Sequence, residues 1–127
     1  MRQLFKVVTK AAVFNRDMSK VLVIYMDRNN DYGLPGGHIE EGEMIEEAMR
    51  RELLEECGVE TELLKKTDFF THSNGKIVLA FVATLKHDDI LSQQNNFEGI
   101  PKWLTREEFE KITIEPSYRT LVLDNWI

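Results

Sequence analysis

The chain has 127 residues, of which 43% are hydrophobic and 30% are charged, and its 22 acidic and 16 basic residues give a net charge of −6. This length favours a single domain, residues 1–127, built around one core. The acidic balance argues against a nucleic acid polymer or an anionic membrane as partner, so we expect a small-molecule partner.

The same sequence predicts a cytoplasmic protein. No stretch approaches the length of a membrane span, and Lys6 and Lys10 interrupt the apolar N-terminal residues where a signal peptide would need a continuous run. The single cysteine, Cys57, cannot form an internal disulfide, which fits a reducing compartment.

The first predicted elements are two strands. Residues 5–15 and 20–26 are rich in Val, Phe, Ile and Tyr and flank the polar segment 16–19, which predicts strands around a turn. Residues 27–33 are polar and predict a loop. A proline turn, residues 34–37, ends in two glycines that can adopt positive φ and let the backbone approach whatever lies at the start of the next helix.

A helix is expected over residues 43–57, with Gly58 at its C-cap. Three acids on one half of this helix, Glu52, Glu55 and Glu56, can converge on one point above it. Acids grouped in this way resist partial burial unless a cation or a proton compensates them. Mg²⁺ prefers oxygen ligands and usually shares a phosphate oxygen of its substrate, so the cluster points to phosphate chemistry.

The alternative interpretation of this segment is a solvated acidic helix. Pairs such as Glu47 with Arg51 and Arg51 with Glu55 would support it, and charge runs commonly have this origin. The flanking glycines favour the chemical interpretation, because they give the helix defined ends and a tight preceding loop.

Further strands and two helices are expected downstream. Residues 60–71 and 76–86 predict strands joined by a hairpin at Asn74-Gly75, and residues 99–104 predict a short strand that Pro101 keeps from a central position. The two helices that follow are marked by a capping-box spacing, a proline and buried apolar candidates: Thr105, Glu108, Phe109, Ile112, Pro116, Leu121, Val122 and Trp126. This order of elements predicts an α/β fold with helices on both sides of a sheet.

Segment 37–59 resembles the Nudix box, G-x5-E-x7-R-E-U-x-E-E-x-G-U, in which U is aliphatic. Each fixed position is matched, and the matching residues are Gly37, Glu43, Arg51, Glu52, Leu53, Glu55, Glu56, Gly58 and Val59. So many fixed positions in one short segment make the signal far more specific than a lone glycine motif. The chain is therefore identified as resembling the Nudix hydrolase family, including its MutT-like members.

The resemblance implies a Nudix-type α/β/α sandwich with a central mixed sheet. It also implies hydrolysis of the pyrophosphate linkage of a nucleoside diphosphate linked to a group X, which includes nucleoside triphosphates, damaged nucleotides and nucleotide sugars. Mg²⁺ is the implied cofactor and Mn²⁺ can substitute for it. A homodimer is suggested by the resemblance alone. The alternative function is a catalytically inactive module that senses a nucleotide, against which the intact acids count.

The resemblance also assigns roles within the site. It implies that Glu52, Glu55 and Glu56 are metal ligands and that the Gly37 carbonyl adds a backbone ligand. Arg51 is expected to orient a box glutamate, with an ordinary exposed ion pair as the alternative.

The general base and the role of Glu43 stay open. Glu52 is the first candidate for the base, and Glu98 is the second because some family members use an acid from a later loop; a solvated loop glutamate is the alternative for Glu98. Asp88 and Asp89 are weaker candidates. Glu43 lies either in the metal site or at the helix start, where an acid favours the dipole.

Contacts with the rest of the substrate are harder to assign. His38 and His72 are expected to be surface residues, because neither has a second metal ligand at a useful spacing. Arg28 is a candidate for substrate contact. Stacking on the base or on X has five aromatic candidates, which are Tyr25, Tyr32, Phe70, Phe97 and Trp103.

Overall fold

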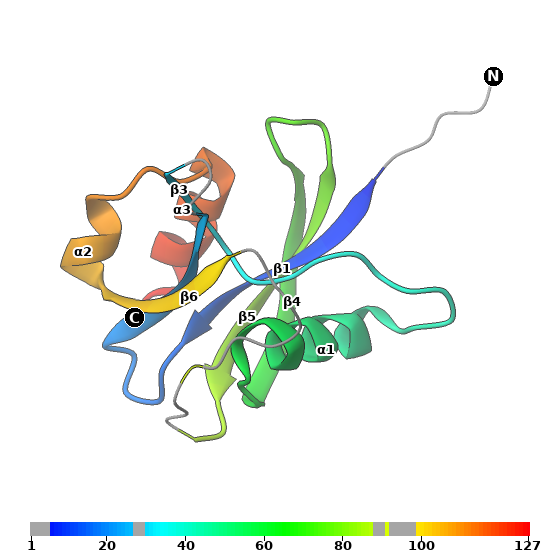
Figure 1. The fold of residues 1–127 in the computed structure, drawn as a ribbon, viewed down its shortest axis with the longest axis horizontal. Coiled ribbons are helices and arrows are strands. Elements are labelled where there is room, and N and C mark those ends of the chain that lie inside the picture. Colours follow the sequence, from blue (N-terminus) through cyan, green and yellow to red (C-terminus); the bar gives the residue numbers. More distant parts are fainter. Residues whose placement is uncertain (1–5, 27–29, 88–90, 92–98) are drawn as a thin grey trace.

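The computed structural model describes residues 6–26, 30–87, 91 and 99–127. These residues form a six-stranded sheet and three helices (Figure 1). The strands are β1 (Val7–Phe14), β2 (Lys20–Met26), β3 (Asp31–Gly33), β4 (Thr61–Thr71), β5 (Ile77–Leu85) and β6 (Ile100–Thr105), and the helices are α1 (Ile45–Cys57), α2 (Arg106–Glu110) and α3 (Pro116–Asn125).

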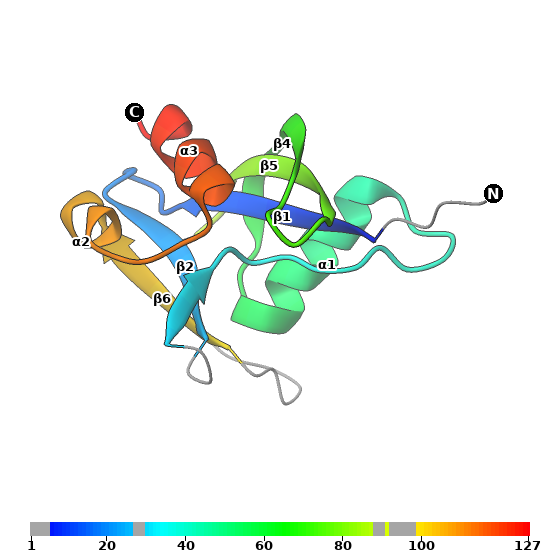
Figure 2. The same cartoon turned by 90° about the horizontal axis from the view of Figure 1, so that it is seen from above.

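The sheet is mixed. Its strand order is β3-β2-β1-β5-β4, and β6 pairs with β2 outside this path. β1 and β5 run parallel, whereas the other pairs are antiparallel. Figure 2 shows α1 on one face of the sheet and α3 on the other. The predicted α/β/α sandwich with a central mixed sheet is therefore confirmed.

Alternate side chains of β1 enter two separate cores. Ala11 and Val13 belong to the buried cluster that includes Leu53 of α1. Phe14 points to the opposite face and joins the cluster that includes Trp126, with the two ring centroids 5.3 Å apart. Full burial of a side chain as large as Phe or Leu contributes about 1.5–3 kcal/mol. β1 is thus held between both helical layers, which fixes its position relative to α1.

Helix α1 has the C-terminal cap that the sequence predicts. Gly58 adopts a left-handed φ of 70° there. The start is two residues later than expected, at Ile45 instead of Glu43. The Glu43 N–H donates to the Glu40 carbonyl at 3.0 Å and so closes a turn. Because Glu43 belongs to this turn, the helix begins after it.

The predicted loop at residues 27–33 is wrong at its C-terminal end. Residues 31–33 form β3, which pairs with β2 through registers such as Ile24↔Gly33 and Tyr25↔Tyr32. A three-residue strand has no periodicity of its own to reveal it, because its stability comes from backbone pairing with a neighbour.

The downstream predictions are confirmed. A turn at Gly75, with φ 93°, joins β4 to β5, and β6 pairs only with β2 among the described strands, which leaves Pro101 in an edge strand. The Thr105 hydroxyl accepts the Glu108 N–H at 3.2 Å, while the Glu108 carboxylate accepts the Thr105 N–H at 2.8 Å. Pro116 opens α3, whose residues Leu121 and Val122 are buried, as is Trp126 just after it.

Candidate active site

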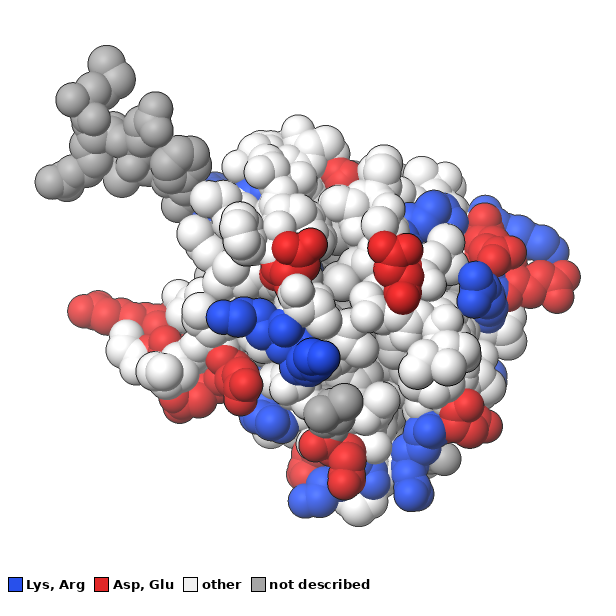
Figure 3. All heavy atoms as spheres, turned by 180° about the vertical axis from the view of Figure 1, so that it is seen from behind, with Lys and Arg blue, Asp and Glu red and all other residues white. Residues whose placement is uncertain are grey.

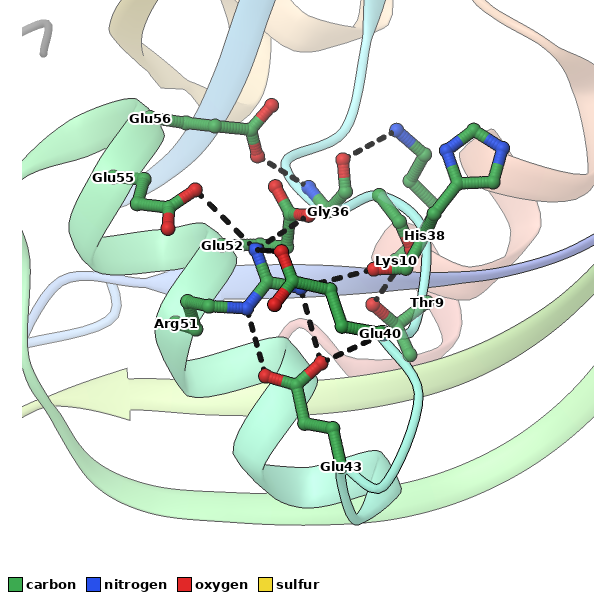
Figure 4. Close-up of polar contacts among 11 residues, drawn as sticks. Thr9, Lys10, Gly36, His38, Glu40, Glu43, Arg51, Glu52, Glu55 and Glu56 are labelled. Atoms are coloured by element: carbon green, nitrogen blue, oxygen red, sulfur yellow. Dashed lines mark hydrogen bonds and ion pairs between the residues drawn. The ribbon is translucent and has the colours of Figure 1, made fainter. Parts of the chain in front are cut away.

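Residues 34–38, here called the glycine loop, run beside β1 before the chain enters α1. The Thr9 N–H donates to the Gly37 carbonyl at 2.9 Å, and the Ala11 N–H donates to the Pro35 carbonyl at 3.1 Å. These are sheet-like hydrogen bonds, so β1 holds the loop as it would hold another strand. Figure 4 shows Gly36 of this loop lying beside the carboxylates of Glu52 and Glu56.

Both glycines of this loop are in places that have no room for a side chain. A Cβ on Gly36, which has φ 140°, would lie 1.9 Å from the Thr9 carbonyl oxygen. A Cβ on Gly37 would lie 2.6 Å from Oε1 of Glu52. The first glycine therefore lets the loop touch β1, and the second lets it touch the acidic edge of α1.

Glu56 is the most deeply buried acid of the helix. Only 7% of it is exposed, and its Oε1 accepts the Gly36 N–H at 2.8 Å. Burial raises the pKa of Glu56 to about 7, although nearby Lys10 and the Gly36 N–H act in the opposite direction. At neutral pH this carboxyl group consequently lies near its titration midpoint while no cation is bound.

Glu52 lies one turn earlier on the same edge. Its side chain is 15% exposed, and its Oε1 accepts a hydrogen bond from Nη1 of Arg51 at 3.2 Å. Burial raises the pKa of Glu52, and the charge of Arg51 opposes that rise. Glu55 is more exposed, at 45% of its side chain, and its Oε2 lies 3.3 Å from the same Nη1 atom.

Arg51 ties the glycine loop to the turn at residues 40–43, which lies between that loop and α1. Its Nε and Nη2 donate to the two oxygens of Glu43 at 2.7 and 3.1 Å, and Nη2 also donates to the His38 carbonyl at 3.0 Å. The hydrogen bonds with Glu43 raise the pKa of the guanidinium further above its usual range. The same contacts lower the pKa of Glu43.

The Glu43 contacts give this residue a role that neither sequence interpretation included. Besides binding Arg51, the Glu43 carboxylate accepts the Glu40 N–H at 2.9 Å. Glu43 therefore fixes Arg51 and the turn before the helix, and it is Glu47 whose carboxylate accepts an N–H at the helix start, that of Met44 at 3.3 Å.

The acidic edge of α1 offers oxygen donors of the kind that a hard divalent cation binds. Among the described residues no three His, Cys, Asp or Glu side chains converge tightly enough to form a ready-made metal site. The chemistry of the donors nevertheless fits, because Glu52 and Glu56 are carboxylates with pKa values raised by burial, and a bound cation would relieve that burial cost. The exposed Glu55 adds a third oxygen donor beside them.

The Gly37 carbonyl fits less well with the role implied for it. It accepts both the N–H of Thr9 at 2.9 Å and the Thr9 hydroxyl at 3.3 Å, so it faces β1. Its role as a backbone metal ligand stays a prediction, and this ligation would require the Thr9 hydroxyl to turn away.

Several predicted residues lie outside the described part of the chain: Arg28, Asp88, Asp89, Phe97 and Glu98. His38 is exposed, as expected. His72 is different, because its ring packs edge-on against Tyr118 with centroids 5.3 Å apart and its Nδ1 lies 3.6 Å from the Glu115 carboxylate.

The described aromatic candidates lie in two regions. Tyr25 and Tyr32 pack against each other with ring centroids 5.1 Å apart, and both are partly exposed. Trp103 packs against the core under α1, and Phe70 packs against the core under α3. Tyr25, Tyr32, Phe70 and Trp103 are all partly exposed, so exposure does not distinguish among them as stacking candidates.

The sequence interpretation missed Thr9 and Lys10 as site residues. Lys10 reaches the glycine loop, where its Nζ donates to the carbonyls of Leu34 and Gly36 at 3.1 Å each. The available signal was a lysine in the middle of a mostly apolar predicted strand, at a position that a half-buried strand normally fills with an apolar residue.

The sequence is similar to those of known proteins of one family. The model of the NUDIX domain matches residues 5–124. The chain is 30% identical to Nudix hydrolase 19, chloroplastic, of Arabidopsis thaliana over 132 residues, which cover 84% of this chain and 29% of that protein. It is 37% identical to the oxidized purine nucleoside triphosphate hydrolase of Danio rerio over 67 residues, which cover 52% of this chain and 38% of that protein. The alignments thus span less than two fifths of either relative.

The fold itself is shared with solved structures. The NUDIX domain of Shewanella oneidensis NrtR, solved in complex with ADP ribose, has a TM-score of 0.83 at 19% identity, covering 96% of this chain and 86% of that chain. A separate observation concerns membranes: within the residues that the structure describes, no helix is long and apolar enough to cross a bilayer.

Proposed function

The chain belongs to the Nudix hydrolase family, and from this we propose that it hydrolyses the pyrophosphate linkage of a nucleoside diphosphate joined to a group X, with Mg²⁺ as its cofactor and Mn²⁺ as a substitute. The observation that carries the proposal is the buried acidic edge of α1. Glu52 and Glu56 lie against the glycine loop, and Arg51 donates a hydrogen bond to Glu52. This arrangement concentrates negative charge where a phosphate-bound cation would fit.

Glu52, Glu55 and Glu56 would hold the metal. When bound, Mg²⁺ would neutralise the charge of the pyrophosphate and lower the pKa of the attacking water. The remaining tasks fall to the protein. The Gly36 N–H keeps Glu56 directed at the loop, and the two-pronged contact of Arg51 with Glu43 keeps the guanidinium beside Glu52 and Glu55.

Glu52 is the first candidate for the general base. Its carboxylate lies at the buried edge of α1 beside the glycine loop, where Arg51 orients it for contact with an attacking water. Glu98 is the second candidate.

The substrate is proposed to be a small nucleotide. The Danio rerio relative is named for oxidized purine nucleoside triphosphates, and the Shewanella oneidensis domain was solved with ADP ribose, so both names point to nucleotides with adjacent phosphates. Figure 3 shows basic and acidic side chains intermixed on the face that it displays, which does not favour a nucleic acid polymer there. A homodimer and a cytoplasmic location stay predictions.

A product analysis tests this function. The protein is incubated with Mg²⁺ and a panel of nucleoside triphosphates, oxidised nucleotides and nucleotide sugars, and the products are separated. We expect a nucleoside monophosphate or X-phosphate product that EDTA abolishes. Glu56→Gln should abolish it too, because the amide keeps the acceptor for the Gly36 N–H but loses the charge. Glu46→Gln, on the exposed first turn of α1, is the matched control and should retain activity.

The alternative is a nucleotide sensor that does not cleave its ligand. Tight nucleotide binding by the wild-type protein without any product across the panel would favour it. Turnover that survives unchanged in Glu56→Gln would instead remove Glu56 from the metal site.

A further inference from the structure

β1 satisfies consecutive carbonyls of the glycine loop in two different ways. The carbonyls of Pro35 and Gly37 accept backbone N–H groups of β1. The carbonyls of Leu34 and Gly36 alternate with them, and both accept hydrogen bonds from the side chain of Lys10 at 3.1 Å. The Lys10 side chain therefore donates hydrogen bonds to the two loop carbonyls that alternate with those bound by the backbone of β1.

This side chain also lies near the acidic edge. Burial lowers the pKa of the Lys10 ammonium, while the negative charges of Glu56 and Glu52 oppose that change. An ammonium taken out of water needs acceptors, and two carbonyls of one short loop provide them. The loop and the lysine thus fix each other.

The position of Gly36 connects this contact to the acids. Its carbonyl accepts from Lys10, and its N–H donates to Oε1 of Glu56 at 2.8 Å. The backbone has little freedom to compensate for the loss of one contact, because Gly36 lies tightly against Thr9 and Gly37 tightly against Glu52.

We propose that Lys10 is a positioning residue for the metal-binding carboxylates, acting through the Gly36 peptide on Glu56. The inference rests on the proposed function, since it assigns Lys10 a task in the same site. Among the contacts described, Lys10 donates to the loop carbonyls and not to the box glutamates, so the positioning effect passes through the loop, while its charge also acts on Glu56 and Glu52 through space.

The test compares Lys10→Met, Lys10→Arg and Lys76→Met with the wild type. Lys76 is the matched charge control. Its charge acts on Lys10, but it lies on the β4–β5 hairpin and not in β1, from which Lys10 reaches the glycine loop. Mn²⁺ affinity is measured without nucleotide from the electron paramagnetic resonance signal of free Mn²⁺. We expect Lys10→Met to bind Mn²⁺ about 10-fold to 100-fold more weakly, the usual effect of losing a partner that orients a ligand. Lys10→Arg should recover part of the affinity, and Lys76→Met should not weaken it.

Other outcomes would overturn the proposal. The Mn²⁺ titrations are made well above pH 7, so that Glu56 is ionised in every variant. If Lys10 acted only through its charge, both Lys→Met variants would then bind Mn²⁺ more tightly, because a repelling cation has been removed. If Lys10 contacted the nucleotide instead, Lys10→Met would raise KM and leave Mn²⁺ affinity and kcat unchanged. If it were merely structural, the folded variant would have wild-type Mn²⁺ affinity and a lower Tm.

A second measurement separates this proposal from the proposed function. Hydrogen exchange of the Gly36 amide is followed by NMR in EDTA, where neither metal nor substrate takes part. Faster exchange in Lys10→Met than in Lys76→Met supports the positioning role even if the wild type shows no hydrolysis. Equal exchange in both variants contradicts the role even if the wild type is an active hydrolase.

Discussion

Arg51 binds both carboxylate oxygens of Glu43, at 2.7 and 3.1 Å, and this pair locks the guanidinium beside the acids of α1. A planar guanidinium can make such a two-pronged contact, whereas a lysine ammonium cannot. Arg51→Lys should therefore keep the positive charge but lose the orientation of Glu52 and Glu55. We expect kcat to fall about 10-fold to 100-fold, with KM changed much less, in steady-state assays with saturating Mg²⁺.

A surface arginine provides the control for this substitution. Arg106 forms an exposed pair with Glu110 at 3.2 Å, and both side chains are about half exposed. Arg106→Lys should leave kcat unchanged, because exposed pairs of this kind contribute little. An equal loss of activity in both variants would contradict an orienting role for Arg51.

The raised pKa of Glu56 predicts how the free energy of unfolding depends on pH. Its pKa is about 7 in the folded protein and 4.5 in its ordinary environment. Between these values the folded protein keeps a proton that the unfolded chain releases, so rising pH lowers the free energy of unfolding of the metal-free protein. Through this group the free energy of unfolding should fall by about 3 kcal/mol, and the decrease should level off above pH 7.

Denaturant unfolding in EDTA at several pH values measures this effect. Glu56→Gln cannot titrate and should lack this component, so the variant should become more stable than the wild type as the pH rises from 5 to 8. A difference in unfolding free energy that stays constant over this range would show that Glu56 does not titrate as described.

The glycine loop predicts different outcomes at two adjacent positions. Gly36→Ala places a methyl group against the Thr9 carbonyl in a backbone conformation that costs about 1–3 kcal/mol for other residues, so we expect strong destabilisation. Gly37→Ala meets the Glu52 carboxylate, a side chain that can move. This variant should fold with nearly normal Tm and lose about 100-fold in kcat/KM through misplaced Glu52.

Gly33→Ala is the control for both substitutions, because nothing lies within 4 Å of a Cβ there and its φ is not positive. It should change neither Tm nor kcat/KM by much. If Gly37→Ala keeps full activity, the close contact between that position and Glu52 has no catalytic importance.

The sequence predicted the local parts of the site well. The acidic edge of α1, its Gly58 cap and the need for glycines before it follow from side-chain spacing and backbone freedom within one segment. Those features depend on residues close together in the chain, which is why a single sequence reveals them.

The missed parts depend on residues distant in sequence. Lys10 and Gly36 meet only because the glycine loop pairs with β1 across 26 positions. In the same way, β3 exists only through its pairing with β2. No periodicity within a segment records such a partner, so Lys10 looked like a simple interruption of an apolar strand.

The two candidates for the general base make opposite predictions. Glu52→Gln removes a carboxylate that Arg51 already holds, and Glu98→Gln removes one from the segment after β5. If Glu52 is the base, Glu52→Gln should lower kcat by about 10²-fold to 10⁴-fold and flatten the acid limb of the pH profile of kcat. Glu98→Gln should then retain both its rate and its acid limb. Measurements at saturating Mg²⁺ limit the contribution of weakened metal binding. A Glu98→Gln variant as slow as Glu52→Gln, with its acid limb lost, would transfer the role to Glu98.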